Sequence, residues 1–462
     1  MGADAGEAVM ARVVGVTKPA VEKPAERAGA YAWYVVGFLT LAGSLSSVDR
    51  QVLALMIGPI KRDFGISDSQ MGLLGGLAFT LLYTFCTVPA AWIADRGSRR
   101  AVVTGGVLFW SLMTSACGLT HRFTTLFLTR MGVGVGEATL GPAAYSMMSD
   151  LFSKRTLPVA VGLFTAAPFI GVGVANVLGG PLVQLFESIT LPPLPVIGAV
   201  KSWQLMFLIL GAPGILVAII GRFTLKEPQR KGLATGDAHK PLSLRQVGTF
   251  FSGRARFLSL MFIAYICLSI QGWALFFWVV EFLVREHHVA RGQAGLIYGM
   301  MAFVLGLAGS VLSGRLASHL LAKGAMDMIM RLVLAAVLVL GPLAILMPLA
   351  PQPWQIFALL VPITFLMGWP GGLGTSALQF IAPNELKGRI VALYYLVVNF
   401  ISLTLGPWLG GVISDKVFAG HSLGGSLCLM AAVDYPVAAI CLFLCLRPFR
   451  AAVTEAAVWE AG

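Results

Sequence analysis

Twelve long apolar runs constrain this chain more than any other feature of its sequence. A helix needs about 20 mainly apolar residues to cross a bilayer, whereas a membrane-spanning barrel shows shorter segments of alternating polarity. We therefore predict an all-α integral membrane protein with twelve transmembrane helices. The runs are residues 32–56, 69–93, 101–119, 123–148, 157–186, 203–222, 257–284, 292–320, 328–349, 354–380, 388–414 and 424–447.

The composition agrees with a chain whose surface faces lipid. Only 12% of its residues are charged, about half the fraction that is usual in a soluble domain. The six cysteines all lie inside apolar runs, and their spacing is typical of neither a zinc site nor a disulfide framework. We therefore expect the lipid bilayer as a partner, and we expect no metal site and no cofactor.

The distribution of lysine and arginine predicts the orientation of the chain in the membrane. With the N-terminus placed inside, 24 of these residues fall on inside segments and 7 on outside loops, and such an excess marks the cytoplasmic side. We predict a multi-pass protein of a bacterial inner membrane with both termini cytoplasmic. This bias accounts for the net charge of +12 without a nucleic-acid partner.

One long polar stretch divides the chain into nearly equal halves. GRLASH after the eighth run parallels AWIADR after the second, and LKGRIVALYY before the eleventh parallels SKRTLPVAVG before the fifth. A duplicated six-helix unit of this kind is common in secondary transporters. The expected organisation is a disordered cytoplasmic tail, a six-helix bundle, a cytoplasmic linker, a second bundle and a C-terminal tail, at residues 1–30, 31–225, 226–253, 254–449 and 450–462.

The fourth run contains two charged residues, in the stretch RMGVGVGEA. Seven helical positions turn about 700°, so Arg130 and Glu137 share one helix face, about 10.5 Å apart along the axis. Charges at membrane depth usually face the protein interior or a water-filled cavity. The glycines between them allow a neighbouring helix to approach closely.

The arginine needs a counterion, because a guanidinium stays protonated. Asp49 in the first run is the candidate, and a conformation-dependent Asp49–Arg130 pair would suit proton coupling. Glu137 has no cation nearby in the sequence and is predicted as a second proton site. Two alternatives stay open: a static Asp49–Arg130 pair, and a permanently protonated Glu137. Arg50 either has a functional role or extends to the outer interface.

Several motifs resemble those of a known transporter family. AWIADRGSRR is similar to the loop between helices two and three of the major facilitator superfamily, and RMGVGVGEA resembles its fourth-helix motif. SSVDRQVLAL, GVGVANVLGG and FLVREHHVARGQAG resemble the Spinster family within it. The resemblance covers essentially the whole chain. It implies two pseudo-symmetric six-helix bundles around a central cavity that opens alternately to each side.

The resemblance also implies a proton-coupled secondary transporter for an amphipathic or lipid-like small molecule. Protons are then the coupling ion, handled by Asp49, Glu137 and Arg130 on helices one and four. The family's loop motif implies a latch between the bundles, in which Asp95 contacts the start of helix eleven near Asn384. The latch set is Asp95, Arg96, Arg99 and Arg100.

Other polar and aromatic residues of the spans are candidates for the substrate cavity, although some of them are equally suited to packing or to facing lipid. A kink is expected at residues 368–372, where glycines surround Pro370. The cavity candidates are Arg50, Tyr83, Asn176, Trp273, Phe277, Trp278, Tyr395 and Asn399.

Two further functions are weighed against this one. The same fold would suit a drug/H⁺ exporter or an organic-anion carrier in which Arg130 binds the substrate. An integral-membrane enzyme would need an intramembrane histidine pair, a nucleophile elbow or a phosphate-binding loop, and none is evident in the sequence. We therefore expect a transporter rather than an enzyme, acting as a monomer.

Overall fold

The computed structural model describes residues 29–153, 156–188, 200–230, 252–322, 327–382 and 384–461. Helices make up nearly all of these segments, and no strand occurs in them. The N-terminal half contains α2 (Ala30–Leu55), α3 (Ile57–Phe64), α4 (Asp68–Gly75), α5 (Leu77–Arg96), α6 (Arg99–Cys117), α7 (Phe123–Glu137), α8 (Leu140–Leu151), α9 (Leu157–Thr165), α10 (Ala167–Ser188) and α11 (Ser202–Thr224).

The C-terminal half is built from longer helices. Most of the expected linker lies outside the described residues, and α19 continues through the segment expected to form a C-terminal tail. The helices are α13 (Ala255–His287), α14 (Arg291–Ala322), α15 (Met328–Leu346), the 3₁₀ turn η2 (Met347–Leu349), α16 (Pro353–Met367), α17 (Trp369–Ile381), α18 (Asn384–Val417) and α19 (Leu423–Ala461).

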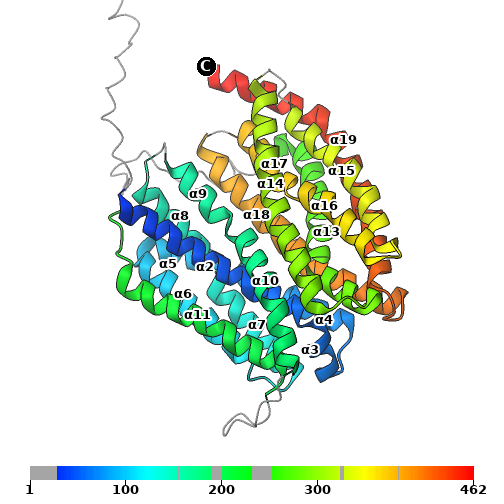
Figure 1. Cartoon of the computed structure of the whole chain (residues 1–462). Coiled ribbons are helices and arrows are strands. Elements are labelled where there is room, and N and C mark those ends of the chain that lie inside the picture. Colours follow the sequence, from blue (N-terminus) through cyan, green and yellow to red (C-terminus); the bar gives the residue numbers. More distant parts are fainter. Residues whose placement is uncertain are drawn as a thin grey trace, which may run out of the picture.

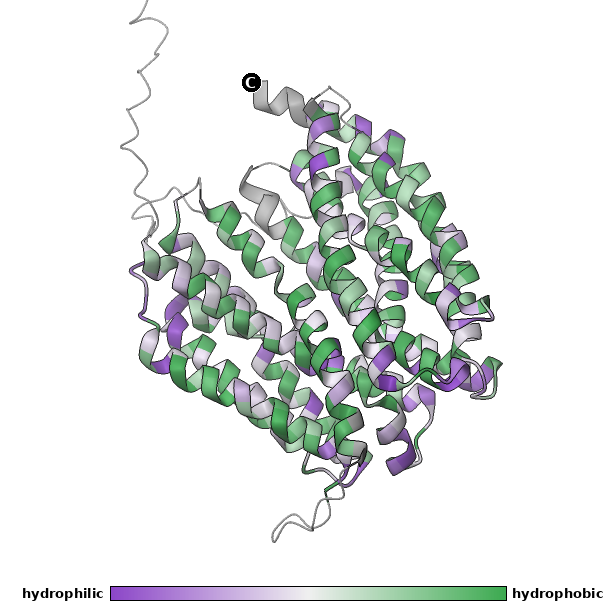
Figure 2. Ribbon diagram, viewed as in Figure 1, coloured by the Kyte–Doolittle hydropathy of each residue, from purple (hydrophilic) through white to green (hydrophobic). Residues whose placement is uncertain are grey.

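The helices confirm the predicted all-α membrane fold. Within the described residues, eleven helical stretches are long and apolar enough to cross a membrane. The remaining expected span, residues 123–148, corresponds to α7 and α8, which a break at Ala138 and Thr139 divides into two shorter helices. Hydrophobic residues make up most of the length of the outer helices, whereas hydrophilic residues are more frequent toward the helix ends (Figure 2).

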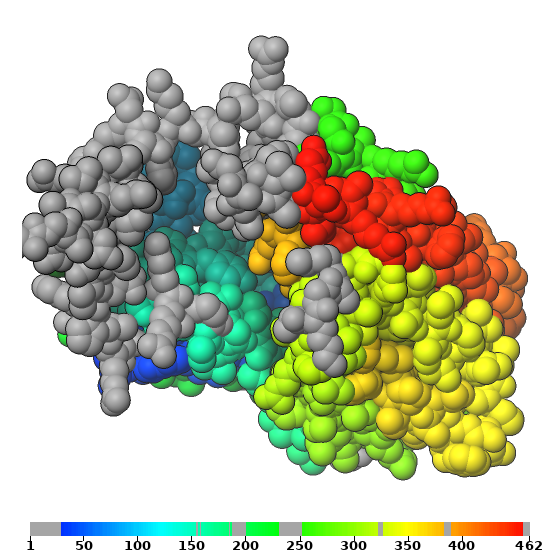
Figure 3. Space-filling model, turned by 90° about the horizontal axis from the view of Figure 1, so that it is seen from above, coloured from blue at the N-terminus to red at the C-terminus, as the bar shows by residue number. Residues whose placement is uncertain are grey.

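Two faces of the molecule are defined by the connections between helices. The start of α2, the end of α19 and the α5–α6 turn lie at one end, called here the termini face, and the α3–α4 and α13–α14 connections lie at the opposite end, the distal face (Figure 1). The halves contact each other mainly through two helix pairs, α10 with α14 and α4 with α18. Seen from the termini face, the halves lie side by side (Figure 3).

The tenth span is interrupted at Gly368, within residues 368–372, where a kink is expected. Helix α16 ends at Met367 and α17 begins at Trp369, so Gly368 is the joint. Its carbonyl oxygen accepts a hydrogen bond from Ser310 Oγ at 3.0 Å. A Cβ at this position would lie 2.5 Å from the carbonyl oxygen of Gly306, so the close approach of α14 requires glycine here.

The glycines of α7 allow the close helix approach that the sequence predicts. A Cβ on Gly134 would overlap the carbonyl oxygen of Phe79 in α5. A Cβ on Gly136 would lie 2.7 Å from the backbone nitrogen of Trp110 in α6. Helix α7 is therefore enclosed by α5 and α6, and its charged residues lie inside the N-terminal half.

This packing gives a prediction for Gly134→Ala. The added methyl group would press on the backbone of α5, so we expect a loss of about 1–3 kcal/mol in unfolding free energy, measured by thermal unfolding of the purified protein in detergent. The control is Gly141→Ala in α8, where no atom lies within 4 Å of an added Cβ. Equal stability of the two variants would contradict the packing described.

Candidate functional site

Three charged side chains are buried together inside the N-terminal half. Asp49 of α2 is 4% exposed, and Arg130 and Glu137 of α7 are 1% and 3% exposed. Helix α7 turns both of its charged residues toward this interior, as their spacing predicts. These groups therefore lie among protein atoms rather than in the hydrocarbon of the membrane.

Arg50 is the ion-pair partner of Glu137. Its Nη1 forms a salt bridge with Glu137 Oε2, which also accepts a hydrogen bond from Ser46 Oγ at 2.6 Å. Nη2 of Arg50 donates to Ser47 Oγ at 3.1 Å. The guanidinium carbon lies 5.2 Å from the centre of the Phe79 ring, a distance at which a cation is attracted to an aromatic face.

This arrangement differs from the ion pair expected between Asp49 and Arg130. No N–O distance of 4.0 Å or less joins these two side chains, and Asp49 Oδ2 instead accepts a hydrogen bond from Thr114 Oγ1 at 2.9 Å. Nε and Nη1 of Arg130 are buried with no hydrogen-bond partner among the described residues. Arg50 is one helical turn after Ser46, so both reach Glu137 from the same face of α2, while Asp49 faces α6.

A cavity of about 430 Å³ lies beside this cluster, between the two halves. Helix α2 and the start of α10 line it from the N-terminal half, and α13, α14 and α17 line much of the other side. Among the described residues that line the cavity, Arg50 is the only charged one. The other polar lining residues are Ser47, Ser269, Thr364 and Asn399, and the aromatic ones are Phe169, Trp273, Phe276, Tyr298 and Tyr435.

Three of the eight cavity candidates line this cavity: Arg50, Trp273 and Asn399. The other five make different contacts. Tyr83 stacks on Phe79, Asn176 Oδ1 accepts from Gln51 Nε2, Phe277 lies against Gly75, Trp278 Nε1 donates to the carbonyl of Pro407, and Tyr395 is exposed beside Tyr394.

Sequence reasoning missed several lining residues, among them Ser47, Phe169, Thr364 and Tyr435. Serine and threonine in an apolar run usually bond to their own helix, as Thr364 Oγ1 does to the carbonyl of Leu360. Their position at the cavity depends on how helices from the two halves meet. A single sequence carries no signal for this.

The arginines of the α5–α6 turn are held within the N-terminal half. Arg99 is 1% exposed and pairs with Asp150 and, at 2.9 Å, with Glu227. Glu227 also accepts from Ser98 Oγ at 2.7 Å and from the Arg100 backbone N–H at 2.9 Å. Burial alone would raise the pKa of Glu227, but these hydrogen bonds hold it below its usual range.

Asp95, the first residue of the expected latch, makes no latch contact with the described residues. Asp95 is exposed and makes no hydrogen bond or ion pair with the described part of the chain. Arg96 stacks over the Trp92 ring at 4.2 Å. Pro383 lies outside the described residues, as do the side chains of Asn384 and Glu385, where the partner was expected. The other two residues of the latch set, Arg99 and Arg100, contact Asp150 and Glu227 rather than the C-terminal half.

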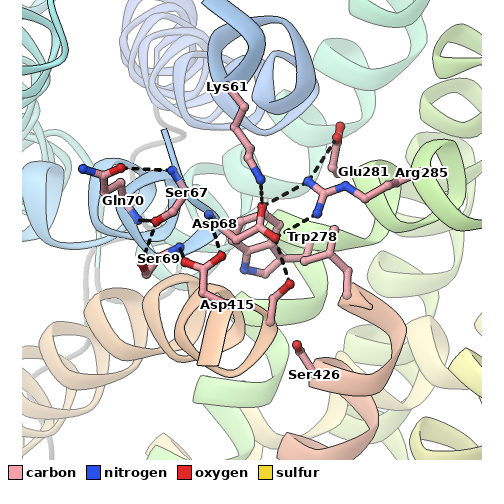
Figure 4. Close-up of polar contacts among 12 residues, drawn as sticks. Lys61, Ser67, Asp68, Ser69, Gln70, Trp278, Glu281, Arg285, Asp415 and Ser426 are labelled. Atoms are coloured by element: carbon pink, nitrogen blue, oxygen red, sulfur yellow. Dashed lines mark hydrogen bonds and ion pairs between the residues drawn. The ribbon is translucent and has the colours of Figure 1, made fainter. Parts of the chain in front are cut away.

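Ionic contacts close the distal face instead (Figure 4). Asp68 at the start of α4 forms a salt bridge with Lys61 and accepts from Arg285 of α13 at 2.8 and 3.0 Å. Arg291 pairs with Glu281 at 2.8 Å and donates to the carbonyl of Leu55 in α2 at 3.0 Å. The two halves are thus joined on the distal side of the cavity.

Comparisons with known proteins agree with this architecture. Residues 39–407 match the family model of the Major Facilitator Superfamily. The chain is 28% identical to an MFS-type efflux pump of Mycolicibacterium smegmatis, over 92% of this chain and 95% of that protein. It is 24% identical to Protein spinster homolog 1 of Xenopus laevis, over 89% of this chain and 78% of that protein.

A solved structure matches almost the whole fold. It is a bacterial homologue of the human lysosomal transporter Spinster in an inward-facing, unoccupied conformation, with a TM-score of 0.76 and 27% identity. The match covers 93% of this chain and 98% of that one. Both the predicted superfamily and the predicted similarity to Spinster are thereby confirmed. The chain belongs to the Major Facilitator Superfamily of membrane transporters, and within it the chain is similar to Spinster proteins.

Proposed function

We propose that this protein couples proton movement to the transport of an amphipathic small molecule by alternating access. The observation that carries this proposal is the position of Arg50. Its guanidinium is the partner of buried Glu137 and is also the charged group of the cavity. A proton site and a substrate site thus share one cation.

The cavity lining favours an amphipathic substrate with an anionic headgroup. Arg50 lies at the side of the cavity formed by α2, whereas the side formed by the C-terminal half is mainly aromatic and aliphatic. A ligand site of this kind binds apolar surface by burial and fixes orientation through a few polar groups. Arginine recognises carboxylate, phosphate and sulfonate-type groups through its planar set of donors.

Proton binding and substrate binding are coupled because the Glu137 carboxylate and the anionic headgroup of the substrate compete for Arg50. While Glu137 is ionised, it holds the guanidinium through the salt bridge that Ser46 supports. Protonation of Glu137 removes this attraction and leaves Arg50 free for an anionic headgroup in the cavity. The proton and the substrate then favour each other's binding, because the coupling between two sites is reciprocal. Asp49, within range of the charges of Arg130 and Glu137, is the second proton site.

The conformation supports a rocking cycle. The ionic contacts of the distal face are closed, while Asp95 on the termini face is exposed. The excess of lysine and arginine assigns the termini face to the cytoplasm, which makes this conformation inward-facing in a bacterial inner membrane. The molecule works as a monomer in this proposal, since each chain carries both halves of the cavity.

The proton sites are tested with an N-acyl taurine, a single-chain lipid whose sulfonate keeps its charge over the pH range used. The wild-type protein should bind it more tightly as pH falls, by at most about tenfold per pH unit for one linked proton. Glu137→Gln should bind with the low-pH affinity at every pH, because glutamine mimics the protonated acid. Affinities are measured by ligand-induced thermal stabilisation from pH 6 to pH 8.

Transport in proteoliposomes completes this test. Asp49→Asn and Glu137→Gln should abolish transport driven by a pH gradient while the protein remains folded. The control is Asp63→Asn, because Asp63 binds Lys201 and Trp203 Nε1 at the distal face, away from the cluster. Normal pH-driven transport in both cluster variants would overturn the proposal.

A second candidate function is an exporter or organic-anion carrier in which Arg130 holds the substrate. Two buried nitrogens of Arg130 lack partners among the described residues, which favours an additional anionic ligand. The similar proteins include the efflux pump named above and a probable L-galactonate transporter of Escherichia coli, 22% identical over 89% of each chain. Arg130 does not line the cavity, however, whereas Arg50 does.

Matched lysine substitutions separate these two functions. Lysine keeps the positive charge but lacks the planar set of donors. We expect Arg50→Lys to weaken binding of the N-acyl taurine by roughly tenfold, the loss of about one charge-assisted hydrogen bond. Arg130→Lys should leave the affinity at low pH unchanged and alter its pH dependence. Loss of binding in Arg130→Lys, with the pH dependence intact, would instead support the second candidate.

A further inference from the structure

The second and eleventh spans form an antiparallel pair across the boundary between the halves. The second span begins at the distal face with α4 at Asp68 and ends at the termini face with α5 at Arg96. Helix α18 begins at Asn384 and ends at the distal face at Val417. Each face therefore has the first turn of one helix and the last turn of the other.

At the distal face, an acid from α18 caps the start of α4 (Figure 4). The carboxylate of Asp415 accepts the backbone N–H of Asp68 at 3.1 Å and that of Ser69 at 2.7 Å. The first N–H groups of a helix have no partner within the helix, and a negative charge is stabilised there by the helix dipole. Part of the capping of α4 thus comes from the opposite half of the protein.

This cap needs the two helices in backbone contact. A Cβ on Gly411, one turn before Asp415, would overlap the carbonyl group of Asp68. A Cβ on Gly72 would overlap the carbonyl oxygen of Pro407. Small residues at these positions allow the close approach. Separation of the halves at the distal face would therefore break both hydrogen bonds of Asp415 together.

Charge pairing at the same place is already complete without Asp415. Asp68 is bound by Lys61, by both terminal nitrogens of Arg285 and, at 2.8 Å, by Ser414 Oγ. The Asp415 carboxylate instead accepts two hydrogen bonds from the backbone of α4. Its role is therefore specific to the contact between the second and eleventh spans.

The termini face has the same elements with the roles of the helices exchanged. Asp95 lies in the last turn of α5, as Asp415 lies in the last turn of α18. In this conformation Asp95 is exposed and has no partner in the described part of the chain. When two rigid antiparallel helices rock against each other about their centre, their contact closes at one face as it opens at the other.

We infer that Asp415 is a positioning residue that holds the distal face closed by capping the first turn of α4 from the opposite half. It is the counterpart, at this face, of the Asp95 latch that the loop motif implies at the termini face. Asp415 caps α4 in this conformation and is released in the other. The inference rests on the alternating access of the proposed function, but it requires neither proton coupling nor a particular substrate.

The test measures the distance between the two halves at each face by double electron–electron resonance, in nanodiscs at pH 7.5 and without substrate. Spin labels are attached to cysteines introduced at Arg122 and His421 on the distal face, or at Ser149 and His319 on the termini face, after the six native cysteines are replaced by alanine. Asparagine at this position has one acceptor oxygen and no charge, so it can keep only one of the two hydrogen bonds to the start of α4. Asp415→Asn should therefore raise the ratio of distal-open to distal-closed molecules by roughly 3- to 10-fold, as expected for the loss of about one hydrogen bond and of a negative charge at a helix start. Asp95→Asn should shift the ratio the other way.

The matched control is Asp63→Asn, which removes an acid of the distal face whose partners, Lys201 and Trp203, belong to the same half. It should leave both distance distributions unchanged, and Asp415→Glu should retain the wild-type ratio. The double variant Asp95→Asn/Asp415→Asn should have a ratio of distal-open to distal-closed molecules between the ratios of the two single variants. Unchanged distances in Asp415→Asn, or an equal shift in Asp63→Asn, would overturn the inference, whereas failure of proton coupling alone would leave these distances unaffected.

Discussion

The cost of placing a charge in hydrocarbon determines how this structure is organised. Each charged side chain in a membrane span must be paired, hydrated or moved to an interface. Arg50 and Glu137 meet this requirement in the N-terminal half by pairing with each other, with Ser46 and Ser47 as additional partners. The paired Arg50 also lines the cavity between the halves, so the ion pair and the cavity share one guanidinium.

The two halves contribute differently to that cavity. The N-terminal half supplies buried ionisable groups on α2 and α7, which glycines bring close to α5 and α6. The C-terminal half supplies mainly apolar and aromatic lining, together with the break at Gly368. In the proposed function, the proton site and the apolar binding surface therefore belong to separate bundles, and rocking of one bundle against the other changes the access to both.

The faces of the molecule differ in what holds the halves together. On the distal face, salt bridges, a backbone cap and glycine contacts all join the halves. On the termini face, Arg99 and Glu227 bind each other within the N-terminal half, and Asp95 is exposed. The same side-chain chemistry therefore serves two purposes, namely stabilising the α5–α6 turn inside one bundle and joining two bundles at the other end.

The sequence by itself determined the twelve spans, their boundaries to within a few residues for most helices, and the burial of Arg130 and Glu137. These features follow from local hydropathy and helical periodicity. Only the tertiary structure decided that Arg50, rather than Arg130, lines the cavity and pairs with Glu137. It also placed Asp415 on the first turn of α4, 346 and 347 residues away along the chain. Such partners depend on the rotation and separation of whole helices. Long-range packing determines both, and a local sequence pattern carries no information about them.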